Sequence, residues 1–371
     1  MTHRVLLISG FFGFEAVGEL RYFEGVGDAL RRAYEAEGEE ADVREVRTLP
    51  TASIRDRAGR VLEALEDLAE AGSGPIHLVG HSTGGLDGRL AIAPSASLDA
   101  DVGDPAALRE RVTSLVTVST PHGGSPLATF FASAAGQPLL RAITALGALV
   151  LDRGTLPVSV VVKLGDMLRN FDDVIGLKGT VLDELYERLL NDLTEERREA
   201  IVELLGEISK DAALVFQLTP EGVDLLDAAT GDPEEIRYGC VITRSPQPTF
   251  SQLRALRHDV YGHATYLIYI LLSALASQTR TDITVDDAQA ARLRELLGEV
   301  PPSSAHDGIV PTLAQAWGEV VAATSADHLD LVGHYGDGEG SADWLPSGSG
   351  FDTEAFHDVW ARVARFQLGS V

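Results

Sequence analysis

Residues 76–92 combine three signals in a fixed order: a short apolar segment, a serine between two glycines, and a helix-forming segment. Residues 76–79 read Ile-His-Leu-Val, and residues 80–84 read Gly-His-Ser-Thr-Gly, a G-x-S-x-G pattern. A serine at a sharp strand-to-helix turn is strained, presents its Oγ, and lies at a helix N-terminus that favours negative charge. A chance match is the alternative in a chain with 37 glycines. The flanking strand and helix favour Ser82 as a nucleophile.

The first 125 residues alternate between strand-like and helix-like segments. Strand-like segments at 5–8, 41–46, 76–79 and 112–118 alternate with helical spacing at 19–37 and 54–71. Such a rhythm predicts a mostly parallel sheet with helices on both faces, an α/β fold. Further segments complete the pattern near the C-terminus: a strand entry at 317–322 and helices at 264–276, 285–297 and 352–368.

The middle of the chain departs from this rhythm. Helix-like stretches dominate there, at 137–151, 160–171, 181–191 and 195–208, and strand signals return weakly at 214–217 and 238–243. We therefore predict one core from residues 1–126 and 252–371, with 127–251 as a mainly helical lid or cap insertion. The apolar stretches at 127–131 and 139–146 are the expected cover of a pocket, and helices packed on the core without gating are the alternative.

Composition limits the partners. Lys and Arg number 30 against 56 Asp and Glu, a net charge of −26, which argues against nucleic acid or an anionic membrane as a bulk partner. The single cysteine, Cys240, permits no internal disulfide and is expected to be a small buried side chain. No secretory signal is visible after Met1, so we expect a cytoplasmic protein, although a processed secreted form remains an alternative.

A serine nucleophile needs a base, and the base needs an orienting acid; where the serine lies in a strand-turn-helix of this kind, the chain order is serine, acid, histidine. Asp307 lies beside Gly308, and His328 follows 21 residues after Asp307, a gap that suits one intervening element. A turn aspartate and a surface histidine are the alternatives. Their order after Ser82 favours catalysis. His122 precedes the insertion and breaks that order, so we expect it to be structural.

Six segments resemble the bacterial true lipases, triacylglycerol lipases of the α/β-hydrolase fold. The resemblance covers roughly the first 130 and the last 70 residues, and such motifs are specific when they occur together. The segments are 5–13 (VLLISGFFG), 20–26 (LRYFEGV), 78–86 (LVGHSTGGL), 118–125 (VSTPHGGS), 307–311 (DGIVP) and 328–332 (HLDLV).

The resemblance implies a role for individual positions of this chain. Ser82 would be the nucleophile, Asp307 the acid and His328 the base. The backbone N–H groups of Phe11 and Thr83 would form the oxyanion hole. The family usually has His-Gly where this chain has Ser-Gly at residues 9–10.

The resemblance also implies a structural calcium near the catalytic histidine, but no cofactor for catalysis. Asp330 would be one ligand and Asp259 is the candidate for the second carboxylate, a donor set that suits a hard cation. The alternative is that Asp330 only caps a turn or pairs with a cation. Asp327, beside His328, is expected to be solvated.

Together these features predict a serine carboxylic-ester hydrolase, a lipase or esterase that cleaves esters with hydrophobic acyl chains. The expected partner is a small-molecule or lipid ester, with transient contact to a lipid interface, and no feature points to a protein partner. An acyltransferase or thioesterase, a polyester depolymerase and a non-catalytic binding protein on the same scaffold remain alternatives. Labelling by a fluorophosphonate and products transferred to an alcohol would separate them.

Overall fold

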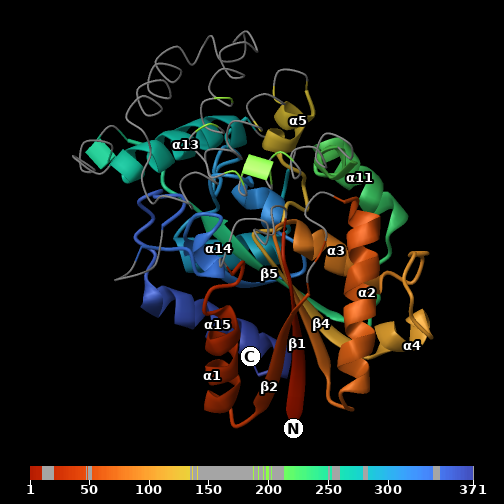
Figure 1. The fold of residues 1–371 in the computed structure, drawn as a ribbon. Helices are drawn as coiled ribbons and strands as arrows, with labels where there is room; N and C mark the ends of the chain where they lie inside the picture. The colour runs from red at the N-terminus through yellow and green to blue at the C-terminus, as the bar shows by residue number, and fades with distance from the viewer. Residues whose placement is uncertain are drawn as a thin grey trace.

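The computed structural model describes most of the chain outside the predicted insertion (Figure 1). The described residues are 1–10, 21–46, 48, 52–133, 213–249, 251–252, 260–278, 283–336 and 343–370, with isolated positions at 136, 140 and between 187 and 202. Within these ranges no helix has the length and apolar character required to cross a bilayer.

A six-stranded parallel sheet forms the centre of the molecule, in the order β2-β1-β3-β4-β5-β6. The strands are β1 (Thr2–Ile8), β2 (Glu40–Val46), β3 (Ile76–His81), β4 (Val112–Val118), β5 (Arg237–Arg244) and β6 (Glu319–Ser325). Because all strands run the same way, their carboxyl ends share one edge of the sheet. The chain order reverses between β1 and β3, and ligand sites of open α/β sheets lie at such reversals.

Side chains alternate between two cores along each strand. In β1, Val5 and Leu7 belong to one apolar cluster, whereas Leu6 and Ile8 belong to the other. In β3, Val79 joins the first cluster and Leu78 the second. This alternation within continuous apolar runs is expected for strands covered on both faces.

Helices cover both faces, as Figure 1 shows. On one face lie α1 (Val26–Ala36) and α15 (Thr353–Leu368), whose fully buried Leu30 and Trp360 join the first cluster. The other face carries α2 (Ile54–Glu70), α3 (Thr83–Ile92), α4 (Pro105–Glu110) and α14 (Asp287–Leu297). Local signals define their ends: Ser53 caps α2 through Asp56 N–H, and Asp286 with Gln289 forms a capping box on α14.

The remaining described elements lie around the carboxyl edge of the sheet and the loops that leave it. They are α5 (Pro126–Ala132), α10 (Ala213–Gln217), α11 (Pro220–Ala229), α13 (Val260–Ala276), and the short 3-10 helices η3 (Thr312–Gln315) and η4 (Asp330–Val332). In Figure 1, α5, α11 and α13 are at the top, at the opposite end from the N-terminus.

The predicted α/β core is confirmed, and one boundary needs correction. The predicted insertion, 127–251, includes β5, which lies between β4 and β6 inside the sheet. β5 carries Gly239, where a Cβ would lie 2.6 Å from Val321 and 3.0 Å from Phe366 of α15. A residue without a side chain weakens a strand signal in sequence but is required here for the close approach of α15.

Two further local expectations have different outcomes. The weak strand signal at 214–217 is wrong, because those residues form α10. The helices predicted at 137–151, 160–171, 181–191 and 195–208 lie outside the described residues except at isolated positions, so the lid stays a prediction.

Candidate active site

Ser82 occupies the turn between β3 and α3 with φ 55° and ψ −128°. A positive φ is rare for a residue with a side chain and marks local strain. A Cβ at Gly80 would collide with the backbone of Gly84, and a Cβ at Gly84 would collide with the carbonyl of Ile8. Both glycines of the G-x-S-x-G pattern are therefore required by close backbone approach, as a strained serine turn demands.

The segment after β1 approaches Ser82 directly. A Cβ built on Gly10 would lie 2.7 Å from Ser82 Cβ and 3.0 Å from the carbonyl oxygen of His81. Phe11, the first predicted oxyanion donor, lies outside the described residues, but its neighbour Gly10 is against the nucleophile. Thr83, the second predicted donor, is the first residue of α3, and its backbone N–H is one of those at a helix start that have no partner within the helix.

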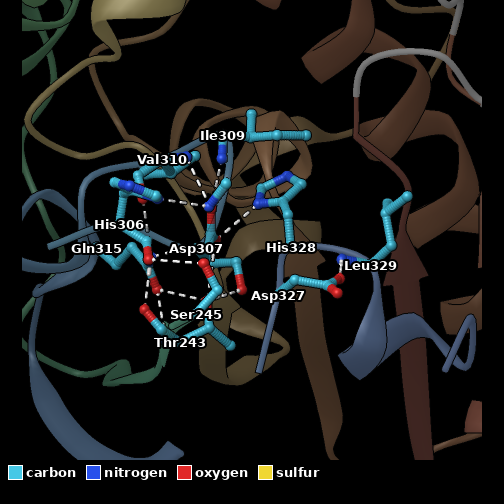
Figure 2. A network of polar contacts seen from close by, with 12 residues as sticks. Thr243, Ser245, His306, Asp307, Ile309, Val310, Gln315, Asp327, His328 and Leu329 are labelled. Atoms are coloured by element: carbon cyan, nitrogen blue, oxygen red, sulfur yellow. Dashed lines mark hydrogen bonds and ion pairs between the residues drawn. The ribbon is translucent and has the colours of Figure 1, made fainter. Parts of the chain in front are cut away.

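Asp307 and His328 form a buried pair (Figure 2). His328 Nδ1 lies 2.8 Å from Asp307 Oδ2, and the His328 backbone N–H donates to the Asp307 carbonyl at 2.9 Å. A carboxylate can only accept, so Nδ1 donates its proton to Asp307, and Nε2 is the nitrogen that would accept a proton from a serine. A short 3-10 helix, η3, and the strand β6 lie between the two residues in sequence, where the gap predicted one element.

The environment of Asp307 keeps its carboxyl group ionised. Burial acts to raise the pKa of Asp307. The charge and hydrogen bond of His328 and two backbone N–H groups act to lower it, and together they outweigh burial. Those N–H groups belong to Ile309 and Val310 and lie 3.0 and 2.7 Å from Oδ1. The net result is a pKa below the ordinary value, as expected for a carboxylate that accepts several donors.

The histidine lies against the serine turn. The rings of His81 and His328 have centroids 4.8 Å apart, so the base is next to the residue that precedes Ser82. Among the described residues, no hydrogen bond reaches the Ser82 hydroxyl. Catalytic hydrogen bonds often tighten only when substrate binds, and this arrangement fits that behaviour.

A buried ion pair between α2 and α3 lies next to the serine turn. Arg57 of α2 pairs with Asp87 of α3 at 2.7 Å, and both side chains are fully buried. The same guanidinium donates to the carbonyl of Ser9 at 2.7 Å and to Thr83 Oγ1 at 3.3 Å. Arg57 therefore ties the segment after β1 to the start of α3. Burial raises the pKa of Asp87 to about 6 although Arg57 opposes the shift.

The predicted calcium site lies only partly within the described residues and stays a prediction. Asp330 Oδ2 already accepts hydrogen bonds from the Asp327 backbone N–H and the Ser349 hydroxyl, at 2.8 and 2.9 Å. Asp259 lies outside the described residues, and no three His, Cys, Asp or Glu side chains within the described part are arranged to hold a metal ion. The expectation that Asp327 is solvated is wrong: its side chain is buried and accepts from Ser347.

Two residues set aside in the sequence are structural. His122 is buried, lies 3.1 Å from Thr117 Oγ1, and stacks on Trp317 with centroids 4.9 Å apart. Cys240 is fully buried in β5, and burial raises the pKa of its thiol to about 12.

Sequence reasoning missed several polar residues that contact the predicted site. They are Tyr22, Arg57, Thr243 and Gln315. Tyr22 falls within a segment that resembles the lipases, and that was the only available signal for it. The other three carry no local motif, because each meets its partner through tertiary structure.

The sheet and the strained serine turn define an α/β-hydrolase fold, and comparison with solved structures supports this. The chain is similar to Staphylococcus hyicus lipase, with a TM-score of 0.52 and 14% identity over 100% of this chain and 96% of that one. It is also similar to EstA from Clostridium botulinum, with a TM-score of 0.53 and 17% identity over 98% and 87% of the two chains.

Lipase 1 from Pelosinus fermentans gives a TM-score of 0.51 and 17% identity over 98% of both chains. At such identities the likeness is one of fold. No protein-family model matches the sequence, and no curated protein matches it.

Proposed function

We propose that this protein is a serine carboxylic-ester hydrolase, a lipase or esterase that acts on esters with hydrophobic acyl chains. One observation carries the proposal: the buried hydrogen-bonded pair of Asp307 and His328 lies at the same sheet edge as the strained Ser82 turn. The fold shared with lipases and esterases supports this reading.

The first half of the proposed reaction forms an acyl-enzyme. Ser82 Oγ attacks the ester carbonyl carbon while His328 Nε2 takes the hydroxyl proton. Asp307 stabilises the imidazolium that results. The N–H groups of Phe11 and Thr83 bind the oxyanion, and each donor contributes about 2.7–4 kcal/mol to transition-state stabilisation. The carbon–oxygen bond to the alcohol then breaks, and His328 returns the proton to the leaving alcohol.

The second half releases the acid. A water molecule gives its proton to His328 Nε2 and attacks the acyl carbon, and the new tetrahedral oxyanion uses the same two N–H groups. When it collapses, the bond to Ser82 Oγ breaks and the proton passes from His328 back to Ser82. The net reaction consumes one ester and one water.

The preference for apolar acyl chains is supported by α5 beside the acid turn. The Ser125 hydroxyl, at the start of α5, donates to the carbonyl of Ile309 at 2.9 Å. The helix that follows carries Leu127, Phe130 and Phe131. Apolar side chains that line a binding pocket favour an apolar part of the substrate, and these three side chains are the candidates.

Turnover of p-nitrophenyl esters of increasing chain length tests the proposal. The Ser82→Ala variant is expected to lose turnover by a factor on the order of 10⁴ or more, and to lose labelling by a fluorophosphonate. Ser95→Ala, which removes an exposed serine hydroxyl, is the matched control and keeps both activities. Full turnover by Ser82→Ala would refute the proposal.

Chain-length dependence tests the substrate class. Rates that rise from acetyl to longer acyl esters support an apolar acyl site, and a preference for acetyl esters counts against it. If an added alcohol acceptor receives most of the acyl group, the protein is an acyltransferase. Release of soluble products from an insoluble polyester would indicate a depolymerase.

A further inference from the structure

The carboxylate of Asp307 accepts hydrogen bonds from two side chains in addition to that of His328. Oδ2 accepts from His328 Nδ1 at 2.8 Å, from Thr243 Oγ1 at 2.9 Å and from Gln315 Nε2 at 3.2 Å (Figure 2). Thr243 is near the end of β5, and Gln315 ends η3. All four side chains are buried. One oxygen atom therefore joins the base to two neutral side chains from different elements.

The orientation of the Gln315 amide is fixed by the backbone. The Thr243 backbone N–H lies 2.7 Å from Gln315 Oε1, and an N–H can only donate, so Oε1 is the acceptor end of the amide. Nε2 then lies 3.2 Å from both Asp307 Oδ2 and the Thr243 carbonyl oxygen, and it donates to each. An amide fixed at both ends presents its N–H to Asp307 in one geometry.

The hydroxyl of Thr243 has one proton and three polar neighbours. Oγ1 lies 2.9 Å from Asp307 Oδ2, 3.1 Å from Gln315 Oε1 and 2.8 Å from Ser119 Oγ. The proton goes to the carboxylate, because hydrogen bonds to a charged acceptor are the stronger ones. Ser119 then donates its own proton to Thr243.

Ser119 adopts an unusual backbone conformation. It has φ 50°, and within the described part of the chain only Ser82 shares a positive φ among residues with a side chain. Its side chain is fully buried at the end of β4. Left-handed conformations cost about 1–2 kcal/mol for such residues. Here the conformation accompanies a short hydrogen bond to Thr243.

We propose that Thr243 and Gln315 are positioning residues for Asp307, with Ser119 anchoring Thr243; we name Thr243 and Gln315 the Asp307 brace. The inference rests on the proposed ester hydrolase. The two donors of the brace on Oδ2 and the two backbone donors on Oδ1 fix the rotation of the carboxylate, and the carboxylate fixes the ring of His328. Reacting groups must be held within a fraction of an ångström, so loss of the brace reduces the rate of the chemical step.

Removing each donor tests the brace. Thr243→Val and Gln315→Leu are expected to lower kcat about 10- to 100-fold, with KM changed by about twofold or less. Thr117→Val and Gln367→Leu are the matched controls, because they remove a buried threonine hydroxyl and a buried glutamine amide away from Asp307. Controls with kcat within about twofold of the parent show that the loss is specific to the brace.

Conservative variants separate the loss of a hydrogen bond from a change in packing, because they change kcat or its pH dependence while keeping the size of the side chain nearly the same. Thr243→Ser keeps the hydroxyl and is expected to restore most of kcat. Gln315→Glu is isosteric, and its protonated carboxyl group supplies both a donor and an acceptor. As pH rises that group ionises beside Asp307, and the two like charges repel. The kcat of Gln315→Glu is therefore closest to the parent value at acidic pH. As pH rises, the ratio of its kcat to that of the parent falls.

A spectroscopic measurement separates this inference from the proposed function. The proton on His328 Nδ1 can be followed by nuclear magnetic resonance in protein with nitrogen-labelled histidine. Its resonance is expected to shift in Thr243→Val and Gln315→Leu and to stay in place in the two controls. If Ser82→Ala keeps full turnover while this shift occurs, the proposed function fails and the brace stands.

Two results would overturn the brace. One is an unshifted His328 Nδ1 resonance in both donor-removal variants. The other is a kcat within about twofold of the parent in both variants while Ser82→Ala is inactive, since the hydrolase then works without these donors. If either donor-removal variant fails to fold, the pH dependence of Gln315→Glu decides: a profile parallel to that of the parent counts against the brace.

Discussion

His81 Nε2 lies 2.9 Å from the carbonyl oxygen of His328. A carbonyl can only accept, so Nε2 carries the proton. Burial lowers the pKa of His81 well below its usual value, and the neutral ring therefore accepts through Nδ1. Tyr22 donates its hydroxyl to that nitrogen at 2.6 Å and accepts the Gly10 N–H at 2.9 Å. A single chain of hydrogen bonds thus links the segment before Phe11, the serine turn and the base.

Removal of the Tyr22 hydroxyl should uncouple this chain. We expect Tyr22→Phe to lower kcat for p-nitrophenyl esters about 10-fold, because Gly10 and His81 lose their shared partner. Burial raises the pKa of Tyr22 and lowers that of His81, so both groups stay neutral and the rate loss should be the same from pH 6 to 9. Tyr34→Phe removes another buried tyrosine hydroxyl, one bonded to Gln367, and is the control. A kcat equal to that of the control would contradict the prediction.

Loss of Arg57 should destabilise the protein through Asp87. Arg57→Met leaves a fully buried carboxylate without its cation, which costs about 3–5 kcal/mol of unfolding free energy. Denaturation by urea measures this change. Arg60→Met, on the same helix, removes an exposed partner of Glu63 and should change stability by about 1 kcal/mol or less.

A second substitution tests the cause. Asp87→Asn in the Arg57→Met background removes the charge and should recover part of the lost free energy. No recovery would mean that packing, and not the unpaired charge, accounts for the loss.

Three carboxyl groups, those of Asp327, Asp330 and Asp343, predict a loss of stability with rising pH. Burial raises the pKa of Asp330 to about 7 and that of Asp343 to about 6, and burial with the charges of both neighbours raises that of Asp327. A raised carboxyl pKa means that the folded state binds protons more tightly, so the stabilisation is present at low pH and is lost as pH rises through these values. Tm should fall between pH 6.5 and 8, and less steeply in Asp330→Asn.

The variant Asp330→Asn also tests the calcium site that the resemblance to lipases predicts. If Asp330 binds the ion, added calcium should raise Tm at pH 8, a chelator should reverse the rise, and Asp330→Asn should show neither effect. The rise should be smaller at pH 5, where protons compete for the carboxyl group. A Tm unchanged by calcium or chelator would contradict the calcium prediction. It would not affect the prediction that Tm falls with rising pH.

His77 predicts the opposite slope at acidic pH. Its buried ring lies 3.0 Å from the ring of His3 and 2.9 Å from Ser114 Oγ, and burial lowers its pKa to about 3. The neutral ring contributes stability that is complete above pH 6.5 and is lost below it, at up to about 1.4 kcal/mol per pH unit. Stability below pH 6.5 should fall less steeply in His77→Asn than in the parent. The same substitution at His357, on α15, is the control for replacement of a histidine.

Much of the candidate site could be predicted because its signals are local. Gly80, Ser82 and Gly84 lie within one turn, and Asp307 precedes a glycine at φ 98°. Chain order then selected His328 among ten histidines. Each of these inferences uses neighbours in sequence or a fixed order, so it needed no coordinates.

The errors share a different cause. Asp327 is polar in sequence but buried in the fold, because Ser347 and backbone N–H groups supply its hydrogen bonds. The predicted insertion includes β5, whose strand signal is weak in sequence, although the sheet places Gly239 of this strand against Phe366 of α15. In both cases a distant partner decides the outcome.

The alternating apolar runs, the parallel sheet and the glycine-flanked serine turn can be predicted from the chain alone, since each depends on residues a few positions apart. The tertiary structure alone decided that Thr243 and Gln315 meet Asp307 and that Tyr22 meets His81. The physical reason is that hydrogen bonds between distant segments depend on how helices and strands pack, and such contacts leave no periodic pattern in the chain.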